Sequence, residues 1–183
     1  MNKRLPFVSF IAASALLFTG CASTVSKEEA EKFVEENYTS TEKKQATVHA
    51  IMDISKSEGI FESFFKVGKT EEDTKDNVSP ITKLDLAGYA ELGDFFKFKT
   101  QGKKFIVEYD VKDMKDVMKM AGQEGNLPEG AEFDGRASGK TVFNENGYPE
   151  SDEASVNLSF EYSSSGITMK GALKMTSKVT YTY

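Results

Sequence analysis

The chain of 183 residues contains one cysteine, Cys21, and one histidine, His49. A single cysteine cannot form an internal disulfide, and a histidine–carboxylate metal site or a Ser–His–Asp triad would have to use His49. His49 alternates with the apolar residues Val48 and Ala50, so we interpret it as a solvent-facing or hydrogen-bonded side chain in a strand. No Gly-x-Ser-x-Gly nucleophile motif is present. The sequence therefore predicts no catalytic residue, no cofactor and no metal ligand.

Two acidic runs contain carboxylates that could form a glycosidase pair or a weak calcium site. The runs are Glu71, Glu72, Asp73 and Asp76, and Glu150, Asp152 and Glu153. Neither run has the spacing or the central glycine of an EF-hand, so we interpret both as solvated loops. An envelope hydrolase remains the third functional hypothesis, and it requires these carboxylates to converge in a cleft.

Two other segments contain residue types found in binding sites. Residues 135–141 (Gly-Arg-Ala-Ser-Gly-Lys-Thr) are similar to a phosphate-binding loop, but only three residues separate the glycines and the segment leads into a predicted strand. Met114, Met118 and Met120 could form a soft binding face, although Met114 and Met118 are more simply explained as core residues. We assign no site to either segment.

The first 21 residues have the organisation of an export signal. Positive charge at Lys3 and Arg4 precedes an apolar segment, residues 5–18, of 14 residues. That length suits the apolar part of a signal peptide and is short of the ~20 residues that cross a bilayer as a helix. The segment ends in the sequence Leu-Phe-Thr-Gly-Cys at residues 17–21.

Residues 17–21 resemble the lipobox of bacterial lipoproteins, in which small residues precede an invariant cysteine. The resemblance implies that the Cys21 thiol receives a diacylglyceryl group and that a peptidase cuts before it. Phe18 stands where leucine is most common. The predicted organisation is a signal peptide at 1–20, a lipidated tether at 21–25 and one domain at 26–183. The alternatives are an ordinary secretory signal and an uncleaved N-terminal anchor.

This resemblance implies an exported, extracytoplasmic protein. It also implies a stable membrane anchor, because two acyl chains, such as palmitate, hold a protein at a membrane. The expected location is the outer leaflet of the cell membrane, or the outer membrane if the cell has one, since Ala22 in place of Asp resembles the outer-membrane sorting signal. Removing Lys3 and Arg4 leaves 21 basic and 29 acidic residues, a net charge of −8. So acidic a chain is not expected to bind nucleic acid.

The remaining sequence predicts one α+β domain with a mainly antiparallel, curved sheet of about eight strands, an N-terminal helix and one inserted helix. Ser26 and Glu29 have the spacing of a helix capping box, and Ala30, Phe33, Val34 and Tyr38 follow at helical spacing. The inserted helix is expected at 114–121. Predicted strands are 46–55, 59–68, 84–91, 95–100, 104–111, 138–144, 156–162 and 167–181. The last strand is expected to bend or break near Gly171 or Ser177.

The connections are predicted from glycine, proline and polar residues. Turns are expected near Ser57, at Gln101-Gly102, at 144–147 and at 163–166, with a charged loop at 70–77 and a further loop at 123–135.

Several predicted strands have large apolar residues on both faces, unlike an antiparallel sheet with one face in water. Helices and sheet curvature could bury both sets, or one face could enclose a hydrophobic ligand. The candidate lining residues of such a cavity are Phe61, Phe64, Phe65, Phe95, Phe96, Phe98, Phe105 and Ile106.

The order of the predicted elements is similar to that of half-barrel lipoprotein carriers and lipid-binding lipoproteins, whose curved sheet and helical lid surround an acyl-chain cavity. Residues 141–149 also resemble a strand–turn stretch of small Gram-positive lipoproteins of unknown function. The leading hypothesis is thus a non-enzymatic, membrane-anchored envelope lipoprotein that binds a lipid, another hydrophobic ligand or an envelope protein partner. The alternative is a structural or protein-interaction lipoprotein without a ligand cavity.

Overall fold

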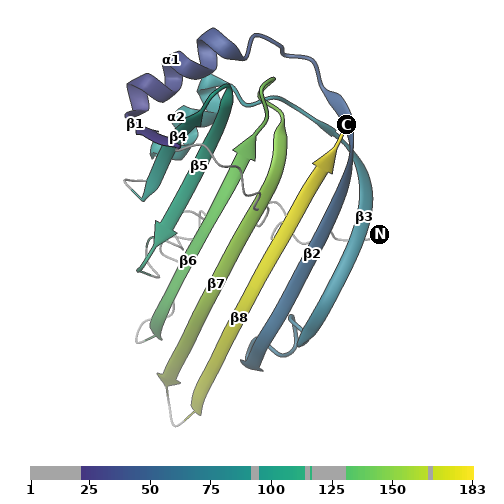
Figure 1. The fold of residues 1–183 in the computed structure, drawn as a ribbon. Helices are drawn as coiled ribbons and strands as arrows, with labels where there is room; N and C mark the ends of the chain where they lie inside the picture. The colour runs from purple at the N-terminus through teal and green to yellow at the C-terminus, as the bar shows by residue number, and fades with distance from the viewer. Residues whose placement is uncertain (1–21, 92–94, 114–115, 117–130, 165–166) are drawn as a thin grey trace.

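The computed structural model contains one open antiparallel sheet and two helices (Figure 1). It describes residues 22–91, 95–113, 116, 131–164 and 167–183. The strands lie in the order β1-β4-β5-β6-β7-β8-β2-β3, so β1 and β3 form the two edges. Their bounds are β1 Ser23–Val25, β2 Lys44–Gly59, β3 Gly68–Val78, β4 Phe96–Gln101, β5 Lys104–Val111, β6 Ala131–Phe143, β7 Pro149–Ser164 and β8 Ile167–Thr182. The expected α+β class and mainly antiparallel sheet are confirmed.

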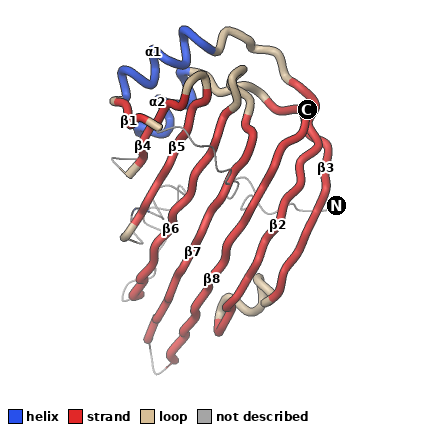
Figure 2. Tube along the Cα trace, in the orientation of Figure 1, coloured by secondary structure: helices blue, strands red, loops and turns tan. Residues whose placement is uncertain are grey.

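Helix α1, Lys27–Asn37, begins at the capping box that the sequence predicts. The Ser26 N–H donates to Glu29 Oε2 at 2.7 Å, and the Glu29 N–H donates to Ser26 Oγ at 3.2 Å. The apolar stripe of α1 faces the sheet, where the Phe33 ring stacks on Phe105 with centroids 5.9 Å apart. Figure 2 shows both helices at the same end of the sheet.

Helix α2, Lys83–Glu91, replaces the strand predicted at 84–91. Thr82 and Asp85 hydrogen-bond each other reciprocally, with the Thr82 N–H and hydroxyl both 2.7 Å from the Asp85 carboxylate, and so start a helix. Leu86 is buried whereas Leu84 is 83% exposed. The alternation of five residues was too short to separate a strand from a helix.

The region from 57 to 78 also differs from the prediction. Strand β2 continues past Ser57 to Gly59, and residues 60–67 form turns where the sequence predicted a strand. The predicted charged loop at 70–77 lies within β3, whose residues from Gly68 to Asn77 are all exposed. An edge strand in water has no need of apolar residues, so its composition resembles that of a loop.

The predicted hairpin β4–β5 and the turn at 144–147 are confirmed. The turn needs a glycine, because Gly147 has φ +82° and a Cβ there would lie 2.8 Å from Tyr38 Cγ. Strand β6 begins at Ala131, so residues 131–135 of the predicted loop are strand, and β7 extends the predicted strand 156–162 at both ends.

Strand β8 runs without a break past Gly171 and Ser177, contrary to the predicted interruption. Its register against β7 is continuous, and the irregularity lies in the neighbouring strand, between Ile54 and Lys56 of β2. A bulge in the partner allows a long strand to continue while the sheet adjusts its twist. The inserted helix expected at 114–121 lies almost entirely outside the described residues.

The two faces of the sheet differ in chemistry. Helices α1 and α2 cover one end of the apolar face in a cluster that contains Ala30, Val34, Tyr38, Ile81, Leu86, Phe98, Phe105, Val107 and Phe143. A second cluster on the same face contains Ile54, Leu173 and Met175, with Phe61 and Phe65 packed against it. The opposite face bears mainly charged and hydroxyl side chains, and we call it the polar face. No described helix is long and apolar enough to cross a membrane.

Candidate functional site

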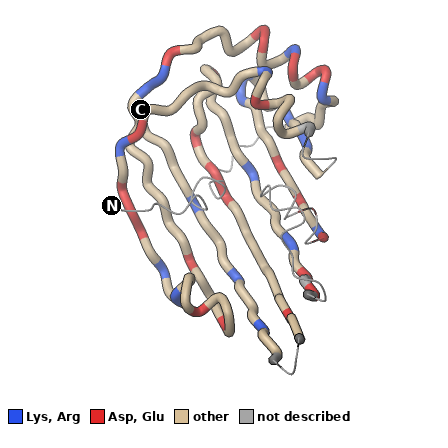
Figure 3. Tube along the Cα trace, turned by 180° about the vertical axis from the view of Figure 1, so that it is seen from behind, with Lys and Arg blue, Asp and Glu red and all other residues tan. Residues whose placement is uncertain are grey.

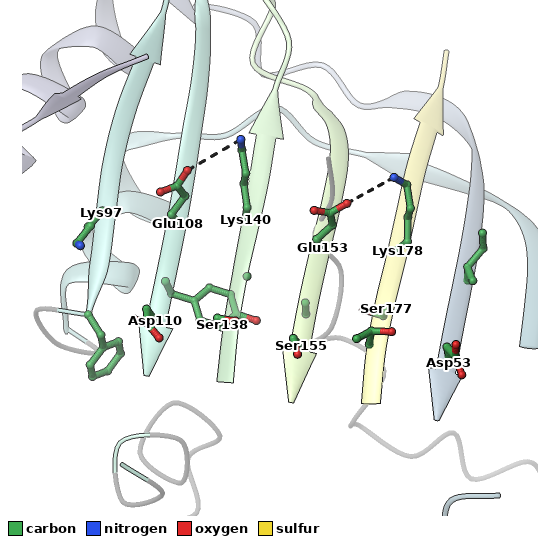
Figure 4. A pocket seen from close by; sticks show the side chains of 16 residues that line it. Asp53, Lys97, Glu108, Asp110, Ser138, Lys140, Glu153, Ser155, Ser177 and Lys178 are labelled. Carbon is green, nitrogen blue, oxygen red and sulfur yellow. Dashed lines mark hydrogen bonds and ion pairs between the residues drawn. The ribbon is translucent and has the colours of Figure 1, made fainter. Parts of the chain in front are cut away.

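The polar face contains a pocket of about 550 Å³ that extends from β4 across the sheet to β2 (Figure 4). Six neighbouring strands contribute side chains to its floor. Consecutive strands lie about 4.8 Å apart, so the floor is wide enough for a small molecule. Its volume is within the roughly 300–1,000 Å³ of small-molecule sites. The pocket is therefore our candidate functional site.

A row of alternating charges crosses the pocket floor, with one residue from each of five adjacent strands. The strand register places Lys97 beside Glu108, Glu108 beside Lys140, Lys140 beside Glu153, and Glu153 beside Lys178. Figure 4 shows these side chains side by side, and we call them the charged row. Opposite charges on directly paired residues stabilise a sheet by roughly 0.2–1 kcal/mol for each pair.

The ion pairs of the charged row are of unequal length. Glu153 Oε1 lies 3.4 Å from Lys178 Nζ, whereas Glu108 Oε1 is 4.0 Å from Lys140 Nζ. Glu108 also accepts a 2.6 Å hydrogen bond from Lys99 through its other oxygen. Lys97 has no ion-pair partner in the described part of the chain. A polar ligand can therefore replace one partner in the longer ion pairs, and it can also bind the ammonium group of Lys97.

A second row of side chains lies two residues along the strands from the charged row. Ser138 pairs with Ser155 and Ser155 with Thr176, so three hydroxyls from β6, β7 and β8 adjoin one another. Asp110 continues this row on β5 and Asp53 continues it on β2. Hydroxyls both donate and accept hydrogen bonds, and carboxylates accept them, so the floor can bind a polar ligand in several orientations.

Among the described carboxyls, the one with the largest pKa shift is Asp152, which lies on the opposite, apolar face. Asp152 is 3% exposed, and it accepts a 2.7 Å hydrogen bond from the Tyr181 hydroxyl. Burial raises the pKa of Asp152 to about 7, against weaker opposing effects of hydrogen bonds from Tyr181 and Thr141. Burial first, and then the Asp152 charge, raise the pKa of Tyr89 and that of Tyr109 to about 12. Asp152 is therefore a polar residue inside the packed face, separate from the pocket.

The structure does not gather the predicted cavity residues around one space. Phe96, Phe98 and Phe105 pack in or against the cluster under the helices. Phe95 lines the polar pocket, and Ile106 is buried on the polar side of β5.

The three phenylalanines of the turns after β2 lie at the other end of the apolar face. Phe61 and Phe65 pack against the second cluster, whereas Phe64 is 74% exposed. The apolar character of Phe61 and Phe65 indicates burial but not the turns that bring them to the sheet, and Phe64 is exposed in spite of it.

The acidic runs lie on strands instead of the predicted loops. Glu150, Asp152 and Glu153 are close in sequence but occupy three environments: Glu150 pairs with Lys104 at 2.6 Å, Asp152 is buried, and Glu153 belongs to the charged row. The other run lies on β3, where Asp73 Oδ1 is 2.8 Å from His49 Nδ1 at the surface. The described residues contain no cluster of three or more potential metal ligands.

The remaining candidate residues are either in strands or outside the described residues. The glycine-containing segment 135–141 lies within β6, so its backbone amides belong to a sheet instead of encircling an anion. Cys21, Met114, Met118 and Met120 lie outside the described residues.

Sequence reasoning missed the charged row because its members come from strands that are distant in the chain. The only local signal is a lysine or glutamate at alternate positions of β4, β5, β6, β7 and β8, and this is also typical of any solvated strand face. Only the strand order and register place the opposite charges next to one another. No protein-family model, curated protein or solved structure matches the chain, so no family is assigned to it.

Proposed function

We propose that this chain is a bacterial cell-envelope lipoprotein, anchored through a diacylglyceryl group on Cys21, whose domain binds a ligand and performs no catalysis. The sequence of residues 1–21 supports the anchor. The observation that carries the binding role is the pocket of about 550 Å³ on the polar face. Its glutamates pair with lysines across the strands, which suits recognition better than acid–base chemistry.

The lining indicates a polar ligand without a large net charge. Three lysines and four acidic residues line the pocket together with the hydroxyl row. Because the opposite charges nearly balance, a strongly charged ligand would gain little from this floor, whereas groups that donate and accept hydrogen bonds find partners at every strand. The apolar side chains Phe95 and Ile51 lie at its two ends.

Native mass spectrometry of the lipoprotein purified from bacterial membranes tests this role. We expect a co-purifying polar molecule that is lost when Ser155→Trp fills the centre of the pocket. Ser159→Trp is the matched control, since Ser159 is an exposed serine on the same face of β7 but outside the pocket. Equal ligand occupancy in both variants would contradict the assignment of the pocket.

The anchor has its own test. Labelled palmitate should enter the wild-type protein, and Cys21→Ser should remain unlabelled and leave the membrane fraction. An unlabelled wild-type protein, or a Cys21→Ser variant that stays membrane-bound, would contradict the lipoprotein assignment, whatever the pocket binds.

A second candidate function is binding of an acyl chain on the apolar face, the role that resembles the half-barrel carriers. It is favoured by a group of apolar side chains that are only partly buried around the second cluster: Met52, Phe61, Phe65, Val156 and Leu158. This role predicts a co-purifying lipid, and Val156→Ser should reduce the amount of lipid bound. Val67→Ser is the control and should leave that amount unchanged, because Val67 is 62% exposed. Capture of one envelope protein with no small molecule would favour the interaction module instead.

A further inference from the structure

Asp152 is a buried carboxyl on the apolar face of the sheet, 3% exposed. Its hydrogen-bond partners are hydroxyl groups, that of Tyr181 at 2.7 Å and that of Thr141 on the neighbouring strand β6. No lysine, arginine or histidine in the described part of the chain forms an ion pair with it. A carboxylate in this place loses its hydration without gaining a counter-ion, so the charged form is unfavourable.

Tyrosines from several elements lie near this carboxyl. Tyr181 belongs to β8 and Tyr183 follows that strand, whereas Tyr109 belongs to β5 and Tyr89 to α2. Burial is the main cause of the raised pKa of all four tyrosines, and the Asp152 charge raises each pKa further. These tyrosines are therefore uncharged near neutral pH, and Asp152 is the group of this cluster that titrates there.

Helix α2 brings no counter-ion to the carboxyl. It contains Lys83 against Asp85 and Glu91, and Figure 3 colours these charges along the chain. Lys83 is already bound by helix α1, since its Nζ lies 2.9 Å from Glu35 Oε1. An ionised Asp152 therefore has an acidic helix beside it and no free ammonium group on that helix.

Of the elements near Asp152, helix α2 is the one that the fold holds least firmly. Strands β6 and β8 pair with β7 along their lengths, whereas α2 lies outside the sheet. The helix has 9 residues, fewer than the roughly 12–15 that a helix needs to be stable alone in water. It depends on packing by Leu86, which is fully buried, and by Tyr89, whose ring centroid is 5.1 Å from that of Phe96. Opening of α2 should therefore cost less free energy than unfolding of the sheet.

We propose that α2 is a pH-responsive cover, which packs over Asp152 while the carboxyl is protonated and opens more readily as the carboxyl ionises. Opening lets water reach the carboxylate, and this removes the cost of a buried charge. It also exposes Phe96 and the apolar cluster under the helices. The cover needs neither the Cys21 anchor nor the polar pocket, so it stands apart from the proposed function.

The expected size of the effect follows from the pKa of Asp152, which burial raises from 3.8 to about 7. In the opened state the carboxyl lies in water and has its ordinary pKa. The packed state thus keeps its full advantage below about pH 4 and loses it as the pH rises to 7. Between pH 5.5 and pH 8.5, the equilibrium constant for opening should rise by about 30-fold.

Hydrogen–deuterium exchange of the full chain measures this opening. Peptides that cover residues 82–91 report on α2, and peptides that cover residues 172–182 report on the paired strand β8. The rates at pH 5.5 and pH 8.5 are divided by the intrinsic exchange rates, which removes the direct effect of pH on the exchange chemistry. Asp152→Asn is the test variant, and Asp134→Asn, at an exposed aspartate on β6, is the matched control.

We expect α2 to be less protected than β8 at both pH values. Its protection should fall by about 30-fold from pH 5.5 to pH 8.5 in the wild type and in Asp134→Asn, and should stay constant in Asp152→Asn. Constant protection of α2 in the wild type, or a fall that persists in Asp152→Asn, would overturn the proposal. Equal protection of α2 and β8 would also overturn it, because α2 would then open only when the whole domain unfolds. The wild-type results decide the question even if Asp152→Asn does not fold.

Discussion

Replacing Asp152 by asparagine should make the protein more stable at alkaline pH. The Asp152 carboxyl is 3% exposed and has no ion-pair partner among the described residues. Its neighbours are the hydroxyls of Tyr181 and Thr141, and nearby tyrosines at 89 and 109 are neutral over the same pH range. An asparagine has the same shape and can keep both hydrogen bonds without a buried charge.

The magnitude follows from the pKa of Asp152, which burial raises from 3.8 to about 7. The folded protein then binds this proton more tightly than the unfolded chain does, so the stabilisation is complete below about pH 4 and is lost as the pH rises to 7. At about 1.4 kcal/mol for each tenfold change in proton affinity, the whole effect is about 4 kcal/mol. Between pH 5.5 and pH 8.5, the contribution of Asp152 to the free energy of unfolding falls by about 2 kcal/mol.

The assay is urea unfolding of the wild type and Asp152→Asn at pH 5.5, 7.0 and 8.5. Subtracting the two free energies of unfolding removes the contributions of the groups that both proteins share. We expect the variant to gain about 2 kcal/mol in free energy of unfolding relative to the wild type from pH 5.5 to pH 8.5. A difference that does not change with pH, or a variant that loses stability relative to wild type as the pH rises, would refute the reasoning.

Three further predictions concern the packing, the backbone and the helix cap. Phe105→Ala should lower the free energy of unfolding by about 3–5 kcal/mol, because the ring is fully buried, while Phe64→Ala at a 74% exposed site should change it by less than about 0.5 kcal/mol. Gly59→Ala should destabilise the protein, since φ is +62° and a Cβ would collide with a backbone oxygen, whereas Gly88→Ala in open space on α2 should not. Ser26→Ala should reduce stability by about 1 kcal/mol by removing the cap of α1, and an unchanged urea midpoint would contradict the role of the cap.

The elements that the sequence predicted well are those whose signal is contained in a few neighbouring residues. Ser26 and Glu29 satisfy each other's backbone within one helical turn, and Gly102 closes a hairpin between two apolar runs. The prediction was wrong where one short sequence pattern is compatible with two kinds of secondary structure. Thr82 and Asp85 start a helix in a segment that also alternates like a strand, and the exposed strand β3 has the composition of a loop.

The candidate site was not predictable, because its chemistry arises between strands. A lysine or a glutamate on β5, β6 or β7 is by itself an ordinary solvated residue. The register turns Glu108, Lys140 and Glu153 into neighbours of opposite charge. Likewise, nothing local distinguishes the buried Asp152 from the half-buried, ion-paired glutamates at 150 and 153.

The sequence by itself determined the acidic charge, the single cysteine after an apolar segment, the cap of α1, the turns at Gln101-Gly102 and at 144–147, and the alternation that produces an antiparallel sheet. The tertiary structure decided the strand order, the charged row, the burial of Asp152 and the pairing of Ser23–Val25 with β4. The physical reason is the range of the interactions. Caps and turns are set within a few residues by backbone hydrogen bonds, whereas register, desolvation and charge pairing depend on which distant segments the fold places side by side.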